Sequence, residues 1–265
     1  MAEIAGAFCL PHHPSITAST ERAQPEQAAR IFSAFEQVRQ QIALRKADTV
    51  IVVGTGHDAS SGPPGRPQML IATGDLEGPL EPWLRIARRP VDNNKPLAAH
   101  ILRTALDSDF DMAASSSLVL DHCVMVPVHL AVPHGTRVVP LYIASGAQPL
   151  ISWKRCKELG AMLRRAVLAW PADERVVILG TGGISQLNPQ FDRMVLELVE
   201  NGDTRAMADL SDERLMREGG NGAFELRNWM VAMGAMPGCR GRIIAYEPMP
   251  EWMTGLGLVE LEIAA

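Results

Sequence analysis

The sequence lacks the features that would indicate a membrane or nucleic-acid partner. No apolar run reaches the roughly 18 residues that a membrane-spanning helix needs. No dense run of Lys and Arg is present, and the net charge is −5. Nucleic acid, membranes and anionic membrane surfaces are therefore not expected as partners. The first residues also lack a basic flank followed by an apolar run, so we expect a cytoplasmic protein.

Cysteine pairs of the C-x-x-C type are absent as well. The chain has four cysteines, at Cys9, Cys123, Cys156 and Cys239. Their spacing does not match the known zinc clusters. In a cytosolic chain of this size, four thiols without disulfide bonds are expected.

The length and composition are sufficient for one sizeable hydrophobic core. The chain has 265 residues, of which 47% are hydrophobic, and we expect a single domain over residues 1–265. Strands are predicted at Ile4–Leu10, Thr49–Val53, Met69–Thr73, Arg137–Ala144, Val176–Leu179, Arg242–Tyr246 and Leu256–Leu261. A long loop is predicted at Ser60–Gly65.

Helical segments alternate with these strands. One helix is predicted from Pro25, with Ile31, Phe35, Val38 and Ile42 on its buried face. Others are predicted at Lys95–Leu106, after an N-cap at Ser152, and over much of 189–235. This alternation predicts a layered α/β fold, with a central mixed sheet flanked by helices.

Four of the seven histidines, at three places in the sequence, are notable because they follow strands or precede a helix. His12-His13-Pro14 follows the first strand, His57 follows Thr49–Val53, and His122 precedes a helix that Pro127 is expected to open. Sheets of the α/β type place ligand-binding groups at such positions. The alternative is that each is a surface or hydrogen-bonded loop histidine.

The remaining histidines are interpreted as structural or surface residues. They are His100, His129 and His134. Because His129 falls inside an apolar helical segment, we expect it to be a hydrogen-bonded core histidine rather than a ligand.

If the segment around Glu225 forms a helix, Glu225 lies on the apolar face of that helix. On a helix it shares that face with Trp229, Ala232 and Met236. A carboxylate in such a place is costly unless a cation or hydrogen bonds compensate it. Its partner is either Arg227 or another arginine, in a structural ion pair, or a metal. Two histidines and one carboxylate form the facial triad of non-haem Fe(II) enzymes, although no local motif such as H-E-x-x-H is present.

The strand Val176–Leu179 runs into a glycine-rich turn, Gly180-Thr181-Gly182-Gly183. Together with Gly54-Thr55-Gly56, this turn raises the alternative of a phosphate or nucleotide site. Neither segment fits G-x-G-x-x-G, because Ser185 and Ala59 occupy the last glycine positions, and no G-K-[ST] follows.

Taken together, these segments resemble the class III extradiol ring-cleaving dioxygenases, the superfamily of the protocatechuate 4,5-dioxygenase catalytic subunit and 2,3-dihydroxyphenylpropionate 1,2-dioxygenase. The resemblance covers nearly the whole chain. It rests on His12-His13-Pro14, Val52–Ser60, Asp121–Pro127, Gly180–Gln186, Glu225 with Leu226 and Trp229, and an ending at Tyr246–Gly257.

The resemblance implies a metal site and an aromatic substrate. Its ligands to Fe(II) are His12, His57 and Glu225, O₂ is the co-substrate, and a catechol-like ring is opened next to its metal-chelating oxygens. His122 lies beside the substrate. Cys123 next to it makes the site sensitive to oxidation, unless it is only a small buried residue. Relatives work as homo-oligomers or with a small second subunit that covers the site, so either is expected here.

The sequence departs from the family at Gln186, where the resemblance calls for a histidine that is a candidate acid or base. Glutamine accepts and donates hydrogen bonds but does not titrate, which leaves His122 as the expected acid/base residue. Three explanations remain open. The substrate has a more acidic proton, as a hydroxypyridone or nitrogen-containing diol would; His122 makes both proton transfers; or the chain is a poor catalyst, or a metal-free or non-catalytic partner subunit on the same fold.

Overall fold

The computed structural model describes residues 1–56 and 67–263, and within these ranges nine strands form one mixed sheet. The strand order is β4-β3-β6-β2-β7-β1-β9-β8, and β5 pairs with β3. The central strands β6, β2, β7 and β1 are parallel, whereas β3, β9 and β8 run antiparallel to their inner neighbours. The strands are β1 (Glu3–Leu10), β2 (Thr49–Thr55), β3 (Met69–Gly78), β4 (Arg89–Val91), β5 (Ala113–Val119), β6 (Arg137–Ile143), β7 (Arg175–Thr181), β8 (Cys239–Met249) and β9 (Thr254–Ile263).

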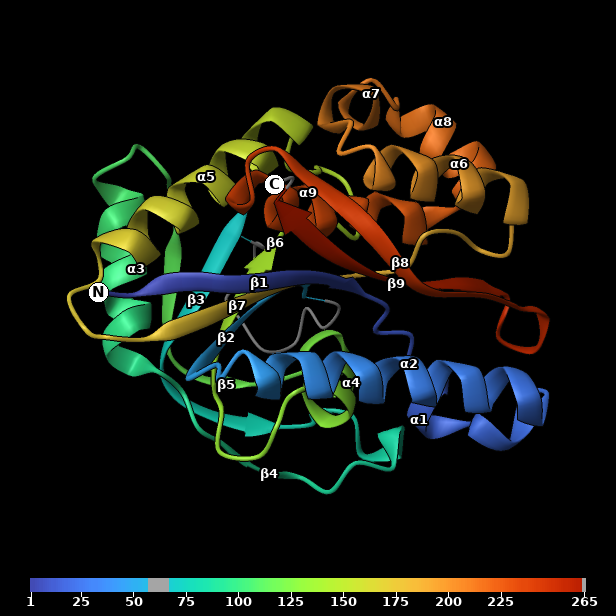
Figure 1. Ribbon diagram of the computed structural model, residues 1–265, viewed down its shortest axis with the longest axis horizontal. Helices are drawn as coiled ribbons and strands as arrows, with labels where there is room; N and C mark the ends of the chain where they lie inside the picture. The colour runs from blue at the N-terminus through green and yellow to red at the C-terminus, as the bar shows by residue number, and fades with distance from the viewer. Residues whose placement is uncertain (57–66, 264–265) are drawn as a thin grey trace.

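Helices cover both faces of the sheet (Figure 1). The lower layer in that view contains α1 (Ser15–Ala18), α2 (Pro25–Leu44) and α4 (His122–Ala131). The upper layer contains α3 (Lys95–Leu106), α5 (Trp153–Ala169), α6 (Pro189–Glu200), α7 (Thr204–Ala208), α8 (Asp212–Gly219) and α9 (Leu226–Ala235). Short 3₁₀ turns lie at η1 (Thr20–Arg22), η3 (Pro82–Leu84), η4 (Asn221–Glu225) and η5 (Pro250–Trp252).

Alternate side chains of the central strands enter two separate hydrophobic clusters. On β2, Ile51 and Val53 join the cluster under α3, α5 and α9, while Val50 and Val52 join the cluster with α2 and α4. All four are fully buried. Burial on both faces explains why the central strands appear in the sequence as continuous apolar runs. Parallel pairing places the carboxyl ends of β1, β2, β6 and β7 along one edge of the sheet, where such sheets bind ligands.

The predicted layered α/β fold with a central mixed sheet is confirmed. Pro25 opens α2, and the Ser152 side chain caps α5 by accepting a hydrogen bond from the Arg155 amide at 3.2 Å. The prediction that Pro127 opens a helix is wrong. Helix α4 begins at His122, because the Asp121 carbonyl accepts the first-turn amides of Val124 and Met125.

Other predictions also need correction or lie outside the described residues. His129 is exposed near the end of α4 rather than buried in the core. Strands β4 and β5 were not predicted from the sequence. Strand β5 contains three consecutive serines and lacks the apolar alternation that is typical of a strand. The predicted loop at Ser60–Gly65 falls outside the described ranges.

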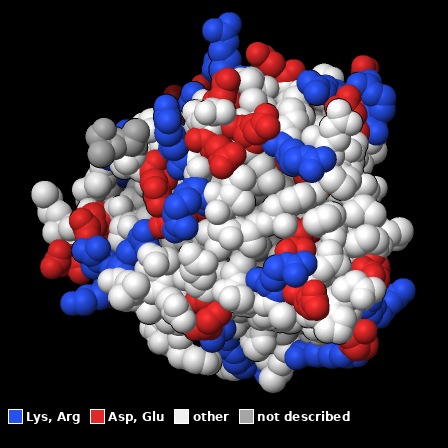
Figure 2. All heavy atoms as spheres, turned by 45° about the vertical axis from the view of Figure 1, so that its right-hand side comes forward, with Lys and Arg blue, Asp and Glu red and all other residues white. Residues whose placement is uncertain are grey.

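The surface carries charges of both signs. On the face shown in Figure 2, Lys and Arg side chains are interspersed with Asp and Glu side chains, so this face has no extended patch of a single sign. Within residues 1–56 and 67–263, no helix is both long and apolar enough to cross a membrane.

Helices α5 and α9 pack with their backbones in unusually close contact. A Cβ atom added to Gly160 of α5 would lie 2.1 Å from the Val231 carbonyl oxygen. One added to Gly234 of α9 would lie 2.4 Å from the carbonyl oxygen of Lys157. Both contacts are with backbone atoms, so the helices could accommodate a side chain only by moving apart. The position of α9, and of the η4 turn before it, therefore depends on these glycines.

We predict that Gly160→Ala lowers the free energy of unfolding by about 1–3 kcal/mol, because the added methyl group overpacks the contact. This loss opposes the gain of roughly 0.5–1 kcal/mol that alanine normally brings inside a helix. Urea unfolding measures the difference. Gly222→Ala is the matched control, because no atom lies within 4 Å of its added Cβ. A Gly160→Ala protein more stable than the wild type would contradict the close packing.

Candidate active site

A cavity of about 660 Å³ lies beyond the carboxyl ends of β1 and β7. Its lining includes four of the five site residues predicted from the sequence, namely His12, His122, Gln186 and Glu225. These four are up to 213 positions apart in the chain (225 − 12) and are brought together only by the fold. The fifth, His57, lies outside the described residues.

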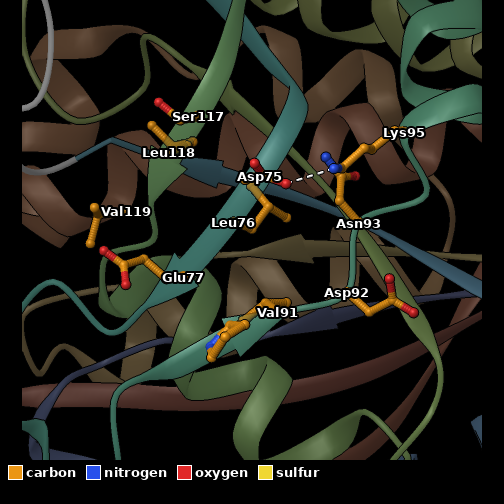
Figure 3. Close-up of a pocket in the computed structure, with 11 residues that line it drawn as sticks. Asp75, Leu76, Glu77, Val91, Asp92, Asn93, Lys95, Ser117, Leu118 and Val119 are labelled. Carbon is orange, nitrogen blue, oxygen red and sulfur yellow. Dashed lines mark hydrogen bonds and ion pairs between the residues drawn. The ribbon is translucent and has the colours of Figure 1, made fainter.

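A second cavity, of about 910 Å³, lies at the other end of the sheet order, between β3, β4 and β5. Figure 3 shows its polar side chains, with the Asp75 carboxylate paired to the Lys95 ammonium at 2.6 Å. Although this cavity is larger, its described lining contains no histidine or cysteine. The histidine-lined cavity is therefore the candidate active site.

His12 is held by its contact with strand β7. The end of β1 pairs with the end of β7, Leu10 opposite Thr181, which places His12 over the glycine turn. The Thr181 hydroxyl donates to the Cys123 carbonyl at 2.9 Å, and its oxygen lies 3.1 Å from His12 Nδ1. Since the hydroxyl hydrogen is directed at a carbonyl, the oxygen accepts the Nδ1 hydrogen. That contact leaves the lone pair of the neutral imidazole on Nε2.

Glu225 faces His12 across the base of the cavity. It is the last residue of η4, so it precedes α9 rather than lying within one helix with Trp229. Its Oε2 lies 3.1 Å from His12 Nε2 and accepts the Gly183 amide at 3.0 Å. The alternative partner, Arg227, is wrong, because that guanidinium pairs with Asp212 and donates to the Ile151 carbonyl.

The glycines of the β7 turn allow this approach. A Cβ atom added to Gly182 would lie 2.6 Å from Glu225 Cβ, and one added to Gly180 would lie 2.6 Å from the Asn228 carbonyl oxygen. Larger residues at these positions would push η4 and α9 away from β7. The turn therefore serves close packing under the cavity, which accounts for its glycines without a phosphate ligand.

His122 forms a pair with Glu81, a residue that the sequence did not single out. Glu81 Oε1 accepts from His122 Nδ1 at 2.6 Å and from the His122 backbone amide at 3.2 Å. Burial raises the pKa of Glu81, but the hydrogen bond and charge of His122 lower it by more, so the net pKa lies below its ordinary value. The rings of His12 and His122 meet edge to face, with centroids 5.6 Å apart.

The outer wall of the cavity is formed by aromatic and amide side chains. The His13 ring stacks on Trp252 with centroids 6.4 Å apart. Burial, followed by repulsion from His12 and His122, lowers the pKa of His13 to about 4. The Gln186 Nε2 donates to Asn221 Oδ1 at 2.6 Å. Gln186 therefore presents a neutral hydrogen-bonding edge to the cavity.

A buried polar network connects the strand ends below the cavity. Asn228 Nδ2 donates to the Thr181 carbonyl at 2.6 Å and to Thr55 Oγ1 at 3.0 Å, and Asn228 Oδ1 accepts from Ser145 Oγ at 2.8 Å. The Thr55 and Ser145 hydroxyls also contact each other. The Asn228 side chain of α9 thus joins the ends of β7 and β2 to Ser145, which follows β6.

His12 and Glu225 have donor atoms suited to a shared metal ion. Two donors that each lie about 2.1 Å from an ion, at right angles, are about 3.0 Å apart. The 3.1 Å between His12 Nε2 and Glu225 Oε2 matches this spacing. Within residues 1–56 and 67–263, no group of three or more His, Cys, Asp or Glu side chains forms a metal site. The third ligand implied by the resemblance, His57, lies outside that part of the chain.

Comparisons with known proteins agree with this arrangement. Residues 6–257 match the family described as the catalytic LigB subunit of aromatic ring-opening dioxygenase. A 2,3-dihydroxyphenylpropionate/2,3-dihydroxicinnamic acid 1,2-dioxygenase of Burkholderia vietnamiensis is 28% identical over 241 residues, which cover 69% of this chain and 72% of the relative. A gallate dioxygenase of Pseudomonas putida is 28% identical over 186 residues, covering 65% of this chain and 54% of the relative.

The fold has a solved counterpart. The uncharacterized protein JW3007 of Escherichia coli K12 superposes with a TM-score of 0.60 at 11% identity, over 97% of this chain and 99% of that one. This likeness concerns the fold alone. The family match spans most of the sequence, so the chain belongs to the aromatic ring-opening dioxygenase family. The predicted resemblance is confirmed, as is the expectation of an oxygenase enzyme in aromatic ring cleavage.

The four cysteines are free thiols buried in the protein, as expected. Burial, and second the nearby Asp121, raise the pKa of Cys123 well above its usual range. Burial likewise raises the pKa of Cys9, and it raises the pKa of Cys156 to about 12 and that of Cys239 to about 11. Since the thiolate is the reactive form, Cys123 behaves as a small buried residue rather than an oxidation-sensitive one.

We therefore predict that iodoacetamide at pH 8 alkylates the folded protein at least about 10²-fold more slowly than the urea-unfolded chain. A raised pKa keeps the thiol protonated at this pH, and burial blocks the reagent. Mass spectrometry of quenched samples counts the modified cysteines. Rapid labelling of Cys123 in the folded state would show that the site opens to solvent.

Proposed function

We propose that the protein is an Fe(II)-dependent extradiol dioxygenase. It would insert both atoms of O₂ into a catechol-like ring, or a hydroxypyridone- or aminophenol-like one, and open the ring next to its metal-chelating oxygens. The observation that carries the proposal is the buried His12–Glu225 pair at the base of a cavity that His122 also lines. The family match and the two dioxygenase relatives support it.

The proposed metal ligands are His12, Glu225 and His57. The first two fit, because their donor atoms are correctly spaced and Thr181 leaves the Nε2 lone pair directed at the carboxylate. His57 is proposed on the resemblance alone. Bound Fe(II) would supply the open positions and the electrons through which a vicinal diol and O₂ react.

His122 is the proposed acid/base residue. Its Nδ1 hydrogen is directed at Glu81, so Nε2, on the other side of the ring, is the nitrogen suited to take the proton of a substrate hydroxyl. Gln186 would orient the ring by hydrogen bonding but cannot carry the proton. His13 and Trp252 would bound the flat aromatic substrate on the outer side of the cavity.

We predict about one iron per chain in protein purified without oxygen, and none in His12→Ala, His57→Ala or Glu225→Ala. The isosteric Thr181→Val should weaken iron binding about 10–100-fold, because it removes the partner that orients His12. Metal analysis and titration of the apoprotein measure both effects. His129→Ala, at an exposed histidine, is the control and should bind iron normally. Wild-type protein that binds no metal and opens no ring would support a non-catalytic partner subunit instead.

A second prediction concerns the proton at position 186. If the natural substrate has an acidic proton, Gln186→His should raise kcat/KM on ordinary catechols by up to about 10²-fold and raise it little on the natural substrate. A panel of catechols, gallates, aminophenols and hydroxypyridones tests this by absorbance of the ring-opened products. Gln186→Asn is the control, since it disturbs the contact with Asn221 but adds no titrating group. An equal response on every substrate would reject the acidic-substrate explanation.

A further inference from the structure

Glu81 and His122 reach each other because they follow two neighbouring parallel strands. Glu77 of β3 pairs with Val119 of β5. The pairing continues past the strands, since the Leu120 amide donates to the Glu77 carbonyl at 2.8 Å and the Leu80 amide donates to the Leu120 carbonyl at 2.7 Å. The carboxyl ends of β3 and β5 therefore deliver a carboxylate and an imidazole side by side.

The contact fixes His122 at two points. Glu81 Oε1 accepts from both the ring Nδ1 and the backbone amide of the same residue. Both side chains are largely buried, with 14% of the Glu81 side chain and 13% of the His122 side chain exposed. The ring can therefore neither turn over nor move along the helix end without losing a charge-assisted hydrogen bond.

The buried carboxylate of Glu81 is not an arrangement that stability by itself would favour. Glu81 Oε2 is buried without a hydrogen-bond partner among the residues that the structure describes. Within the same residues, the ion pair of Glu81 is made with His122. A buried carboxylate oxygen without a partner destabilises the folded protein. An apolar side chain would avoid this cost, so the carboxylate is explained better by what it does to His122.

We infer that Glu81 is a positioning residue that keeps His122 in the form required for proton transfer. It holds the proton on Nδ1 and keeps Nε2, on the other side of the ring, as the nitrogen that can meet a substrate hydroxyl. The inference rests on the proposed function. Because Gln186 does not titrate, the orientation of His122 matters for the proposed proton transfer.

The first test compares Glu81→Gln with Glu77→Gln. We expect Glu81→Gln to lower kcat about 10²-fold with little change in KM, and to leave the free energy of unfolding unchanged or higher. Glu77 is the matched control, because it lies four residues earlier, is half-exposed and pairs with Arg88 instead. The loss of kcat should shrink on catechols whose ring hydroxyl is more acidic, and Glu81→Asp should restore part of it.

The second test asks whether Glu81 acts through His122. In a double-mutant cycle, Glu81→Gln should cost nothing further in a His122→Ala background. An equal further loss in that background would overturn the inference, as would full kcat in Glu81→Gln. A parallel fall in stability and kcat, without rescue by Glu81→Asp, would assign Glu81 a purely structural role and overturn it as well.

A third measurement separates this inference from the proposed function. Nitrogen-15 NMR of the histidine rings reports the tautomer of His122 whether or not the protein turns over substrate. A proton on Nδ1 in the wild type that is lost or mixed in Glu81→Gln supports the positioning role, even if no substrate is opened. The same tautomer in both proteins overturns it, even if ring cleavage is established.

Discussion

The candidate site depends on one close approach, between the glycine turn after β7 and the η4–α9 segment. Gly180 and Gly182 leave room for backbone atoms that any side chain would displace. Because of that contact, the Gly183 amide reaches the Glu225 carboxylate, and the carboxylate reaches His12 at the end of β1. Helix α5 packs closely against α9, so the same segment is in backbone contact on that side as well. The geometry of the His12–Glu225 pair is therefore set by backbone packing, which is less adjustable than side-chain rotation.

Beneath this pair, buried hydrogen bonds replace the apolar contacts that fill the rest of the core. Asn228 and Thr181 together use their donors and acceptors on the ends of β2 and β7, on Ser145 after β6, and on His12. A satisfied network of this kind fixes one arrangement more strictly than hydrophobic contacts do, because each broken bond leaves a buried polar group without a partner. The strand ends are thus held in place where the proposed metal site would need a fixed His12, while Gln186 on the outer wall stays exposed.

The sequence was sufficient to predict the central strands, most helices and the four site residues that gather in the cavity, since each follows a strand or lies in a family block. It could not predict β5, because Ser115, Ser116 and Ser117 carry no hydrophobic alternation. Glu81 was missed because its contact with His122 depends on the pairing of β3 with β5, a strand that the sequence did not reveal. The start of α4 was misplaced because the helix carries Pro127 in its interior rather than at its first turn. Arg227 was one of the alternative partners considered for Glu225, but tertiary packing turns it toward Asp212.

Proton handling connects the unusual residue at position 186 with the dyad that the fold assembles. A site with two titrating groups can divide proton removal and proton return between them, and neither group then needs a partner that holds it in one tautomer. Under the proposed function, with a glutamine at position 186, His122 would have to accept a proton and later give it back. It must therefore keep one orientation in both charge states. A buried carboxylate on Nδ1 meets that requirement, because it binds the neutral and the protonated ring through the same hydrogen. The buried carboxylate of Glu81 beside His122 is therefore consistent with a non-titrating amide at Gln186.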